Sequence, residues 1–247
     1  MSEVTVRFLG TGDAFGSGGR FQTCICVESE ESRFLIDFGA SSLIAMKCQG
    51  VNTSDIDAIF LSHLHGDHFG GLPFLFLHEQ LVSKRTRPIT IAGPPGLEKR
   101  VYEAMEAFFP GSSRIKRRFA VDFVELAERT PIEIGKVRAT SFPVVHPSGS
   151  PSLALRIECG GKVIAYSGDT EWTDALVAAA AGADLFVSEA YYFSKSMKFH
   201  LDYRTLMDHR AELRCERLML THASEDLLGR LGELEAECAQ DGQWFIV

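Results

Sequence analysis

Short apolar runs recur along both halves of the chain, separated by polar and glycine-rich segments. Runs such as Val4–Leu9, Phe34–Phe38 and Ala58–Leu61 are too short for stable helices and rich in β-branched and aromatic residues, so they predict strands. The other predicted strands are Thr23–Val27, Ile89–Ala92, Val121–Glu125, Ile132–Ile134, Arg138–Val145, Leu153–Glu158, Val163–Tyr166, Leu185–Val187 and Leu218–Leu220. Strands in this number must bury their apolar faces against another layer.

Segments with helical signals lie between the strands. Helices are predicted from Ser41 or Ser42 through Lys47, after Gly71-Leu72-Pro73, over Leu97–Phe109, in the alanine-rich stretch after Asp169, over Tyr203–Leu213, and after Ser224 with Leu227, Leu228, Leu231 and Leu234 on one face. Strands and helices are interspersed rather than strictly alternating, which favours an α+β fold, a four-layer αββα sandwich, over a doubly wound sheet. No repeat or linker interrupts the 247 residues, so one domain over 1–247 is predicted.

Composition and charge narrow the class of partner. The net charge of −8 argues against broad attraction to nucleic acid. No segment approaches the roughly 18 uninterrupted apolar residues of a membrane helix, and Met1–Val4 lacks the features of a signal peptide. We therefore expect a cytoplasmic protein with no membrane partner. Cys24 and Cys26 alternate along a predicted strand, so both should point to one face as buried thiols.

The densest group of chemistry-bearing residues follows the predicted strand Ala58–Leu61. It reads His63-x-His65-x-Asp67-His68, and imidazole and carboxylate ligands at this density suit zinc, with manganese or iron as alternatives. Residues 63 and 65 share one side of an extended chain, so their rings can converge on one ion. Asp67 and His68 follow a glycine at which the backbone can turn toward a second ion. The cluster predicts a hydrolytic metal site.

This cluster resembles the signature of the metallo-β-lactamase superfamily, and the resemblance extends over most of the chain. It implies three further ligands, His146 in Phe-Pro-Val-Val-His, Asp169 in Tyr-Ser-Gly-Asp-Thr and His222 in Leu-Met-Leu-Thr-His. The implied assignment puts His63, His65 and His146 on one metal and Asp67, His68 and His222 on the other, with Asp169 bridging. Two such cations bind a hydroxide at neutral pH and stabilise the attacking and leaving oxygens together.

Three features resemble the ribonuclease Z branch and favour a phosphodiester substrate. Two are the opening Phe-Leu-Gly-Thr-Gly-Asp at 8–13, with Arg20 and Thr23 after it, and the Ser-Gly-Asp-Thr at 167–170. The third is His200, similar to an extra histidine of ribonuclease Z and of the cyclic-phosphate phosphodiesterase of the carbon–phosphorus lyase pathway. The resemblance implies that His200 donates a proton to the leaving alkoxide or holds a phosphate oxygen. The alternative is a surface histidine that caps the next helix.

Glu189 matches the acidic position of the His-Glu-Ala motif of ribonuclease Z, although Ser188 stands where that motif has histidine. The match implies that Glu189 orients His200. Catalysis is thus predicted to depend on Asp67, His200 and Glu189. The superfamily resemblance also suggests a homodimer.

The short interval between His146 and Asp169 limits the size of the expected substrate. Bacterial ribonuclease Z carries a long tRNA-binding arm between the third-histidine motif and the aspartate, whereas only 23 positions separate His146 from Asp169 here. That interval leaves room for a turn and two strands. We therefore expect a small phosphodiester, a cyclic nucleotide or a sugar cyclic phosphate. The alternatives are lactone or ester hydrolysis on the same metals and ribonuclease Z-type cleavage of tRNA 3′ ends.

Overall fold

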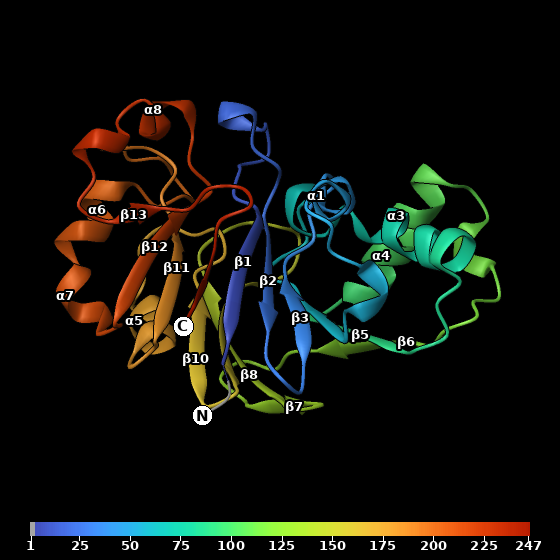
Figure 1. Ribbon diagram of the computed structural model, residues 1–247. Coiled ribbons are helices and arrows are strands. Elements are labelled where there is room, and N and C mark those ends of the chain that lie inside the picture. The colour runs from blue at the N-terminus through green and yellow to red at the C-terminus, as the bar shows by residue number, and fades with distance from the viewer. Residues whose placement is uncertain (1–2) are drawn as a thin grey trace.

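The computed structural model describes residues 3–247, and two seven-stranded sheets form its centre (Figure 1). The first sheet contains, in spatial order, β14 (Trp244–Ile246), β1 (Thr5–Gly10), β2 (Cys24–Glu28), β3 (Arg33–Ile36), β4 (Ala58–Phe60), β5 (Ile89–Gly93) and β6 (Val121–Glu125). The second contains β13 (Glu237–Cys238), β12 (Arg217–Thr221), β11 (Leu185–Glu189), β10 (Lys162–Tyr166), β9 (Ser152–Cys159), β8 (Val137–Val144) and β7 (Ile132–Ile134).

The two sheets bury their inner faces against each other. Phe34 and Phe60 of the first sheet pack edge to face, with ring centroids 5.4 Å apart. They belong to one apolar cluster with Leu155 and Val187 of the second sheet. Because side chains alternate along a strand, every second residue of each run enters this layer. This shared core is the reason that two sheets form a sandwich.

Helices cover the two outer faces, so the predicted four-layer αββα sandwich is confirmed (Figure 1). The first sheet is covered by α1 (Ser42–Cys48), α2 (Gly66–Phe69), α3 (Leu72–His78) and α4 (Leu97–Phe108). The second is covered by α5 (Asp174–Ala180), α6 (Tyr203–Asp208), α7 (Arg210–Leu213) and α8 (Glu225–Leu228). Cys24 and Cys26 are free thiols on the outer face of the first sheet, as predicted.

The C-terminal region differs from the prediction. The expected helix after Ser224 ends at Leu228 and is followed only by a 3-10 turn at Leu231–Glu233, because glycine at 229 and 232 disfavours a continued helix. The Ser224 hydroxyl donates to the Tyr191 carbonyl and does not cap α8. The predicted helix Tyr203–Leu213 is divided into α6 and α7. The short strands β13 and β14 were not predicted, since their pairing is long-range.

The strand directions bring the predicted site residues to one edge. β10, β11 and β12 are parallel, and β8 runs in the same direction because it and β10 both pair antiparallel with β9. Asp169, Glu189 and His222 lie at or just beyond the carboxyl ends of β10, β11 and β12, and His146 follows β8. Carboxyl ends of parallel strands are the usual place for ligand sites. Among residues 3–247, no helix has the length and apolar character needed to span a membrane.

Candidate metal centre

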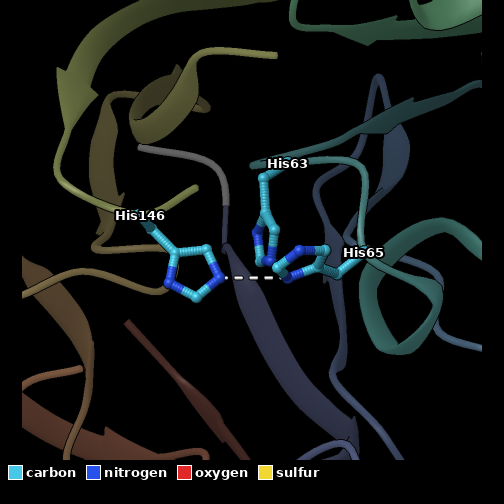
Figure 2. Close-up of side chains that lie close together, drawn as sticks. All are labelled: His63, His65 and His146. Carbon is cyan, nitrogen blue, oxygen red and sulfur yellow. Dashed lines mark hydrogen bonds between the residues drawn. The ribbon is translucent and has the colours of Figure 1, made fainter. Parts of the chain in front are cut away.

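Three histidines from two loops form the first group of possible metal ligands (Figure 2). His63 and His65 lie in the loop after β4, and His146 lies in the loop after β8. Nε2 of His146 is 3.0 Å from Nδ1 of His65, and the His63 ring lies 5.0 Å from His65 and 4.8 Å from His146 between centroids. One ring nitrogen of each histidine lies within 4.8 Å of the others. Three imidazoles in this arrangement can hold one cation.

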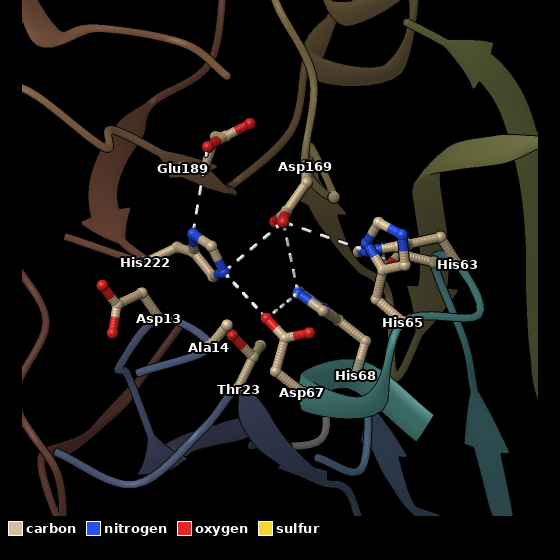
Figure 3. Close-up of polar contacts among 12 residues, drawn as sticks. Asp13, Ala14, Thr23, His63, His65, Asp67, His68, Asp169, Glu189 and His222 are labelled. Carbon is tan, nitrogen blue, oxygen red and sulfur yellow. Dashed lines mark hydrogen bonds and ion pairs between the residues drawn. The ribbon is translucent and has the colours of Figure 1, made fainter. Parts of the chain in front are cut away.

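Asp67, His68, Asp169 and His222 form the second group (Figure 3). Oδ2 of Asp67 is 3.2 Å from Nε2 of His68 and 3.3 Å from Nε2 of His222. All four side chains are buried. Asp67 and His68 reach this position because α2 begins at Gly66, directly after His65, and redirects the backbone. One continuous segment, residues 63–68, therefore supplies ligands to both groups.

Asp169 lies between the two groups. Its Oδ2 is 3.4 Å from Nε2 of both His68 and His222 in the second group. The same oxygen is 3.8 Å from Nε2 of His63 and 3.9 Å from Nε2 of His146 in the first group. A single carboxylate oxygen at comparable distances from both groups has the position that a bridging ligand requires. The structure thus brings together all seven residues predicted as ligands.

The first group is held in the form that binds metal. Burial lowers the pKa of His63 well below its ordinary value, because the uncharged ring is preferred away from water. Burial likewise lowers the pKa of His65 and His146. The three rings are therefore neutral at physiological pH and keep a lone pair for a cation.

The second group has the opposite electrostatic balance. Burial opposes protonation of His68 and His222, but the nearby carboxylates outweigh it and raise the pKa of both, that of His222 to about 9. Burial would raise the pKa of Asp67 and Asp169, but the neighbouring imidazoles lower both. The carboxylates therefore stay ionised, and a bound cation would take the place of the imidazole protons.

Several buried atoms of the cluster fit a cation. Nε2 of His63, Nε2 of His68 and Oδ1 of Asp169 have no hydrogen-bond partner among residues 3–247. An unsatisfied buried polar atom costs about 1–3 kcal/mol. Metal coordination would satisfy the lone pairs of these atoms. The donor set, imidazoles and carboxylates without thiolates, suits zinc, manganese or iron.

Asp37 supports the second group and was not among the predicted site residues. It lies just after β3, and its Oδ2 is 2.7 Å from Nδ1 of His68. The Ser62 backbone N–H donates to Oδ1 at 2.7 Å, and the Ser62 hydroxyl donates to Oδ2 at 2.8 Å. A carboxylate that accepts from Nδ1–H leaves Nε2 as the free lone pair of His68. An aspartate inside the apolar run Phe34–Phe38 was the sequence signal for this role.

His200 and Glu189 form a pair beside the cluster. Nδ1 of His200 is 3.0 Å from Oε2 of Glu189 and 4.0 Å from Oδ2 of Asp169. The other Glu189 oxygen accepts from the Thr170 backbone N–H. Burial, followed by the charge of Asp169, raises the pKa of Glu189 to about 7. The His200 ring packs on Tyr191, with centroids 5.0 Å apart.

His200 does not cap the following helix. The N-cap of α6 is Asp202, whose carboxylate accepts from the Thr205 backbone N–H at 3.0 Å. The capping alternative for His200 is therefore wrong. Its ring instead lies 4.9 Å from His146 and stacks at 5.8 Å on His222, so it contacts both ligand groups.

The fold and the site define a metal-dependent hydrolase of the metallo-β-lactamase fold, with a His/Asp cluster able to hold two metals. A family model described as anti-Pycsar protein Apyc1 matches residues 4–245, and the chain belongs to that family. Ribonuclease Z of Agathobacter rectalis is 27% identical over 91% of this chain and 89% of its own length. The predicted resemblance to the ribonuclease Z-like branch of the superfamily is therefore confirmed.

Solved structures give the same classification. The short form of human tRNase Z superposes with a TM-score of 0.79 at 27% identity and covers 98% of both chains. A diphosphatase of the PhnP family superposes with a TM-score of 0.77 at 20% identity, over 98% of this chain and 97% of its own. At 20% identity, the similarity to the diphosphatase shows a shared fold only.

Proposed function

We propose that this hydrolase cleaves a small phosphodiester, a cyclic nucleotide or a sugar cyclic phosphate. The observation that carries the proposal is the Glu189–His200 pair, which places an imidazole next to the bridging position of Asp169. Phosphodiester cleavage expels an alkoxide, which needs a proton or strong charge stabilisation to leave. A histidine fixed by a buried carboxylate beside a cation site can supply that proton.

The seven predicted ligands fall into two groups, each of which would hold one cation. We assign His63, His65 and His146 to one cation and Asp67, His68 and His222 to the other, with Asp169 between them. Zinc is the first choice of metal, and manganese or iron fit the same donors. Two such cations, when bound, acidify a water molecule and neutralise the charge of a phosphate.

Glu189 positions His200 and sustains its charge. Burial opposes protonation of His200, but the hydrogen bond and the charge of Glu189 outweigh it and raise the pKa of His200. With Nδ1–H donated to Glu189, Nε2 is the atom left for substrate. The Thr170 N–H holds the second Glu189 oxygen, so the carboxylate cannot rotate away without losing a bond.

The segment before Asp169 supports a small substrate. β9 and β10 occupy Ser152–Cys159 and Lys162–Tyr166 and pair with each other. They use most of the interval in which the bacterial tRNA enzymes carry their arm. The net charge of −8 also disfavours a polyanionic substrate. Relatives named ribonuclease Z make tRNA 3′-end cleavage the second candidate.

A substrate panel on zinc- and manganese-loaded enzyme tests the proposal. It should contain cyclic nucleotides, a sugar cyclic phosphate, bis-p-nitrophenyl phosphate, a lactone, a thioester and a pre-tRNA. We expect turnover of the phosphodiesters and its loss in Asp67→Ala. Turnover of lactones or thioesters without phosphodiesters would refute the substrate class, and cleavage of pre-tRNA alone would favour the second candidate.

The role of His200 has a separate test based on the leaving group. An alkoxide needs a proton, whereas p-nitrophenolate leaves without one. His200→Ala should therefore lower kcat on a cyclic nucleotide by about 10²–10⁴-fold and on bis-p-nitrophenyl phosphate far less, with metal content unchanged. His209→Ala is the matched control, since His209 stacks on Trp172 and pairs with Glu212 outside the cluster. Equal losses on both substrates, or loss of metal, would contradict proton donation.

Three further properties remain proposals. We propose that residues 1–247 act as one domain, that the chain forms a homodimer, and that it works in the cytoplasm. Light scattering on purified protein would give the oligomeric state, and a single cooperative melting transition would support one domain.

A further inference from the structure

The C-terminal segment 239–243 crosses from one sheet to the other. It connects β13, an edge strand of the second sheet, with β14, an edge strand of the first (Figure 1). Its first residue donates a backbone hydrogen bond to Leu220 of β12 at 2.8 Å, and Gly242 donates one to Phe8 of β1 at 2.7 Å. The segment therefore joins two strands that each lead into a loop, β12 into the ligand His222 and β1 into a glycine-rich loop.

Asp241, in the middle of this segment, holds both ends of the glycine-rich loop. Its Oδ1 accepts from the Thr11 backbone N–H at 2.9 Å and from the Thr11 hydroxyl at 2.7 Å. Its Oδ2 accepts from the Phe21 backbone N–H at 2.7 Å. Arg20 adds a donor, since its Nη1 lies 3.1 Å from Oγ1 of Thr11. Hydrogen bonds to a carboxylate are stronger than those between neutral groups, so one side chain fixes the position of Thr11.

Thr11 in turn contacts the end of β12. Its carbonyl oxygen accepts from the His222 backbone N–H at 3.0 Å and from the Thr221 hydroxyl at 3.4 Å. Thr11 is fully buried, so water cannot replace these bonds if the loop moves. Asp241, Thr11 and His222 thus form a continuous chain of hydrogen bonds. Asp241 and Thr11 lie 230 positions apart in the sequence, and no local pattern predicts their contact.

His222 has a backbone conformation that depends on such support. Its φ is 57°, in the left-handed region that few residues other than glycine adopt. A residue keeps this conformation only where its surroundings hold it there. The conformation directs Nε2 of His222 to within 3.3 Å of Oδ2 of Asp67 and 3.4 Å of Oδ2 of Asp169.

The His222 ring lacks the support that orients other ligand rings of the cluster. A metal-binding histidine usually donates its second ring nitrogen to a carboxylate or carbonyl. Nδ1 of His68 contacts Asp37, and Nδ1 of His146 contacts the Phe199 carbonyl. Nδ1 of His222 is buried and has no hydrogen-bond partner among residues 3–247, since Oε2 of Glu189 is 3.9 Å away. The backbone bond to Thr11 is therefore the polar contact that sets the direction of this ring.

We propose that Asp241 is a positioning residue for the metal ligand His222 and acts through Thr11. The inference rests on the assignment of His222 to a cation in the proposed function, and it holds for any substrate. Without the carboxylate, the Thr11 carbonyl is free to leave the His222 N–H, and φ of His222 can relax to a negative value. Nε2 then moves away from Asp67 and Asp169. The group of His63, His65 and His146 is not connected to Asp241 in this way, so only one of the two metals should be affected.

Two measurements on Asp241→Asn test the proposal. The introduced amide keeps the volume of the side chain but has one acceptor oxygen in place of two. Chelator competition should show a loss of about tenfold in affinity for one metal, the lower end of the effect of groups that orient ligands, and no change for the other. NMR of the metal-free protein should show faster hydrogen exchange at the His222 amide, a readout that needs neither metal nor activity.

Three variants serve as controls. Asp184→Asn also removes a carboxylate that accepts from a backbone N–H, that of Val163 at 2.8 Å, and from a side chain, that of Lys162 at 2.9 Å. It should lower Tm without changing either metal affinity. Thr11→Val removes only the hydroxyl and should weaken the same single metal as Asp241→Asn does, whereas Thr11→Ser keeps the hydroxyl and should restore wild-type affinity.

Each outcome supports or overturns the inference. If Asp241→Asn lowers Tm but leaves both metal affinities and the His222 exchange rate unchanged, the residue only stabilises the fold and the inference is wrong. Equal weakening of both metals would also overturn it. If Asp241→Asn does not fold, Thr11→Val decides, and wild-type affinity at both sites would be the contradicting result. A wild-type protein that binds two metals but cleaves no phosphodiester would refute the proposed substrate class alone. Binding of fewer than two metals by the wild type would refute the ligand assignment and this inference with it.

Discussion

Replacing Asp37 with asparagine should weaken metal binding while leaving the chain folded. Asp37 has a backbone φ of 59°, a left-handed conformation that asparagine tolerates better than most residues. The side-chain oxygen of the introduced asparagine can still accept from the Ser62 N–H, as Oδ1 of Asp37 does now at 2.7 Å. What is lost is the anionic acceptor at 2.7 Å from Nδ1 of His68.

The size of the effect follows from what His68 loses. Without an anionic acceptor at Nδ1, its proton can move to Nε2, the atom that lies 3.4 Å from Oδ2 of Asp169 and is needed for the metal. Changes to such supporting partners typically cost about 10–100-fold in metal affinity. This loss of affinity corresponds to about 1.4–2.7 kcal/mol of metal-binding free energy, at about 1.36 kcal/mol per tenfold change.

Competition against a chromogenic chelator measures this directly. The variant should release one of two metals at a chelator concentration about 10–100-fold lower than the wild type, with an unchanged circular dichroism spectrum. Asp184→Asn is the control, because Asp184 pairs with Lys162 at the other end of the β10 and β11 strands, away from the metal ligands. A folded Asp37→Asn protein with wild-type affinity at both sites would refute the role assigned to Asp37.

Three further perturbations have defined expected outcomes. Gly39→Ala should weaken metal binding and lower Tm by about 3–10 °C, because the added Cβ would lie 2.2 Å from the Asp67 carbonyl oxygen. Gly66→Ala is the control, since its Cβ meets nothing within 4 Å and Tm should stay nearly unchanged. Equal changes of Tm in the two variants would contradict this steric argument. Chelation of a metal present at about 100 times its Kd should lower Tm by about 5–10 °C, and an unchanged melting curve would argue against structural coupling. Iodoacetamide at pH 8 should label exposed Cys48 but not Cys24, because burial raises the pKa of the Cys24 thiol well above its usual value. Mass spectrometry of the peptides measures the labelling, and modification of Cys24 in the folded protein would contradict its burial under the helices.

The sequence alone was enough for the parts of the protein that depend on short-range geometry. Almost all strands were predicted within a few residues, because alternation and β-branched composition act locally. The cluster from His63 to His68 could be predicted as a metal site because its spacing lies within one short segment. Resemblance then supplied His146, Asp169 and His222, each at the end of a predicted strand.

Only the tertiary structure decided which distant groups meet. Asp37 contacts His68 because β3 and β4 are parallel neighbours, and no local pattern specifies that pairing. The His-x-His-x-Asp-His cluster thus followed from local chain geometry, whereas its supporting carboxylate, Asp37, followed from the pairing of β3 with β4.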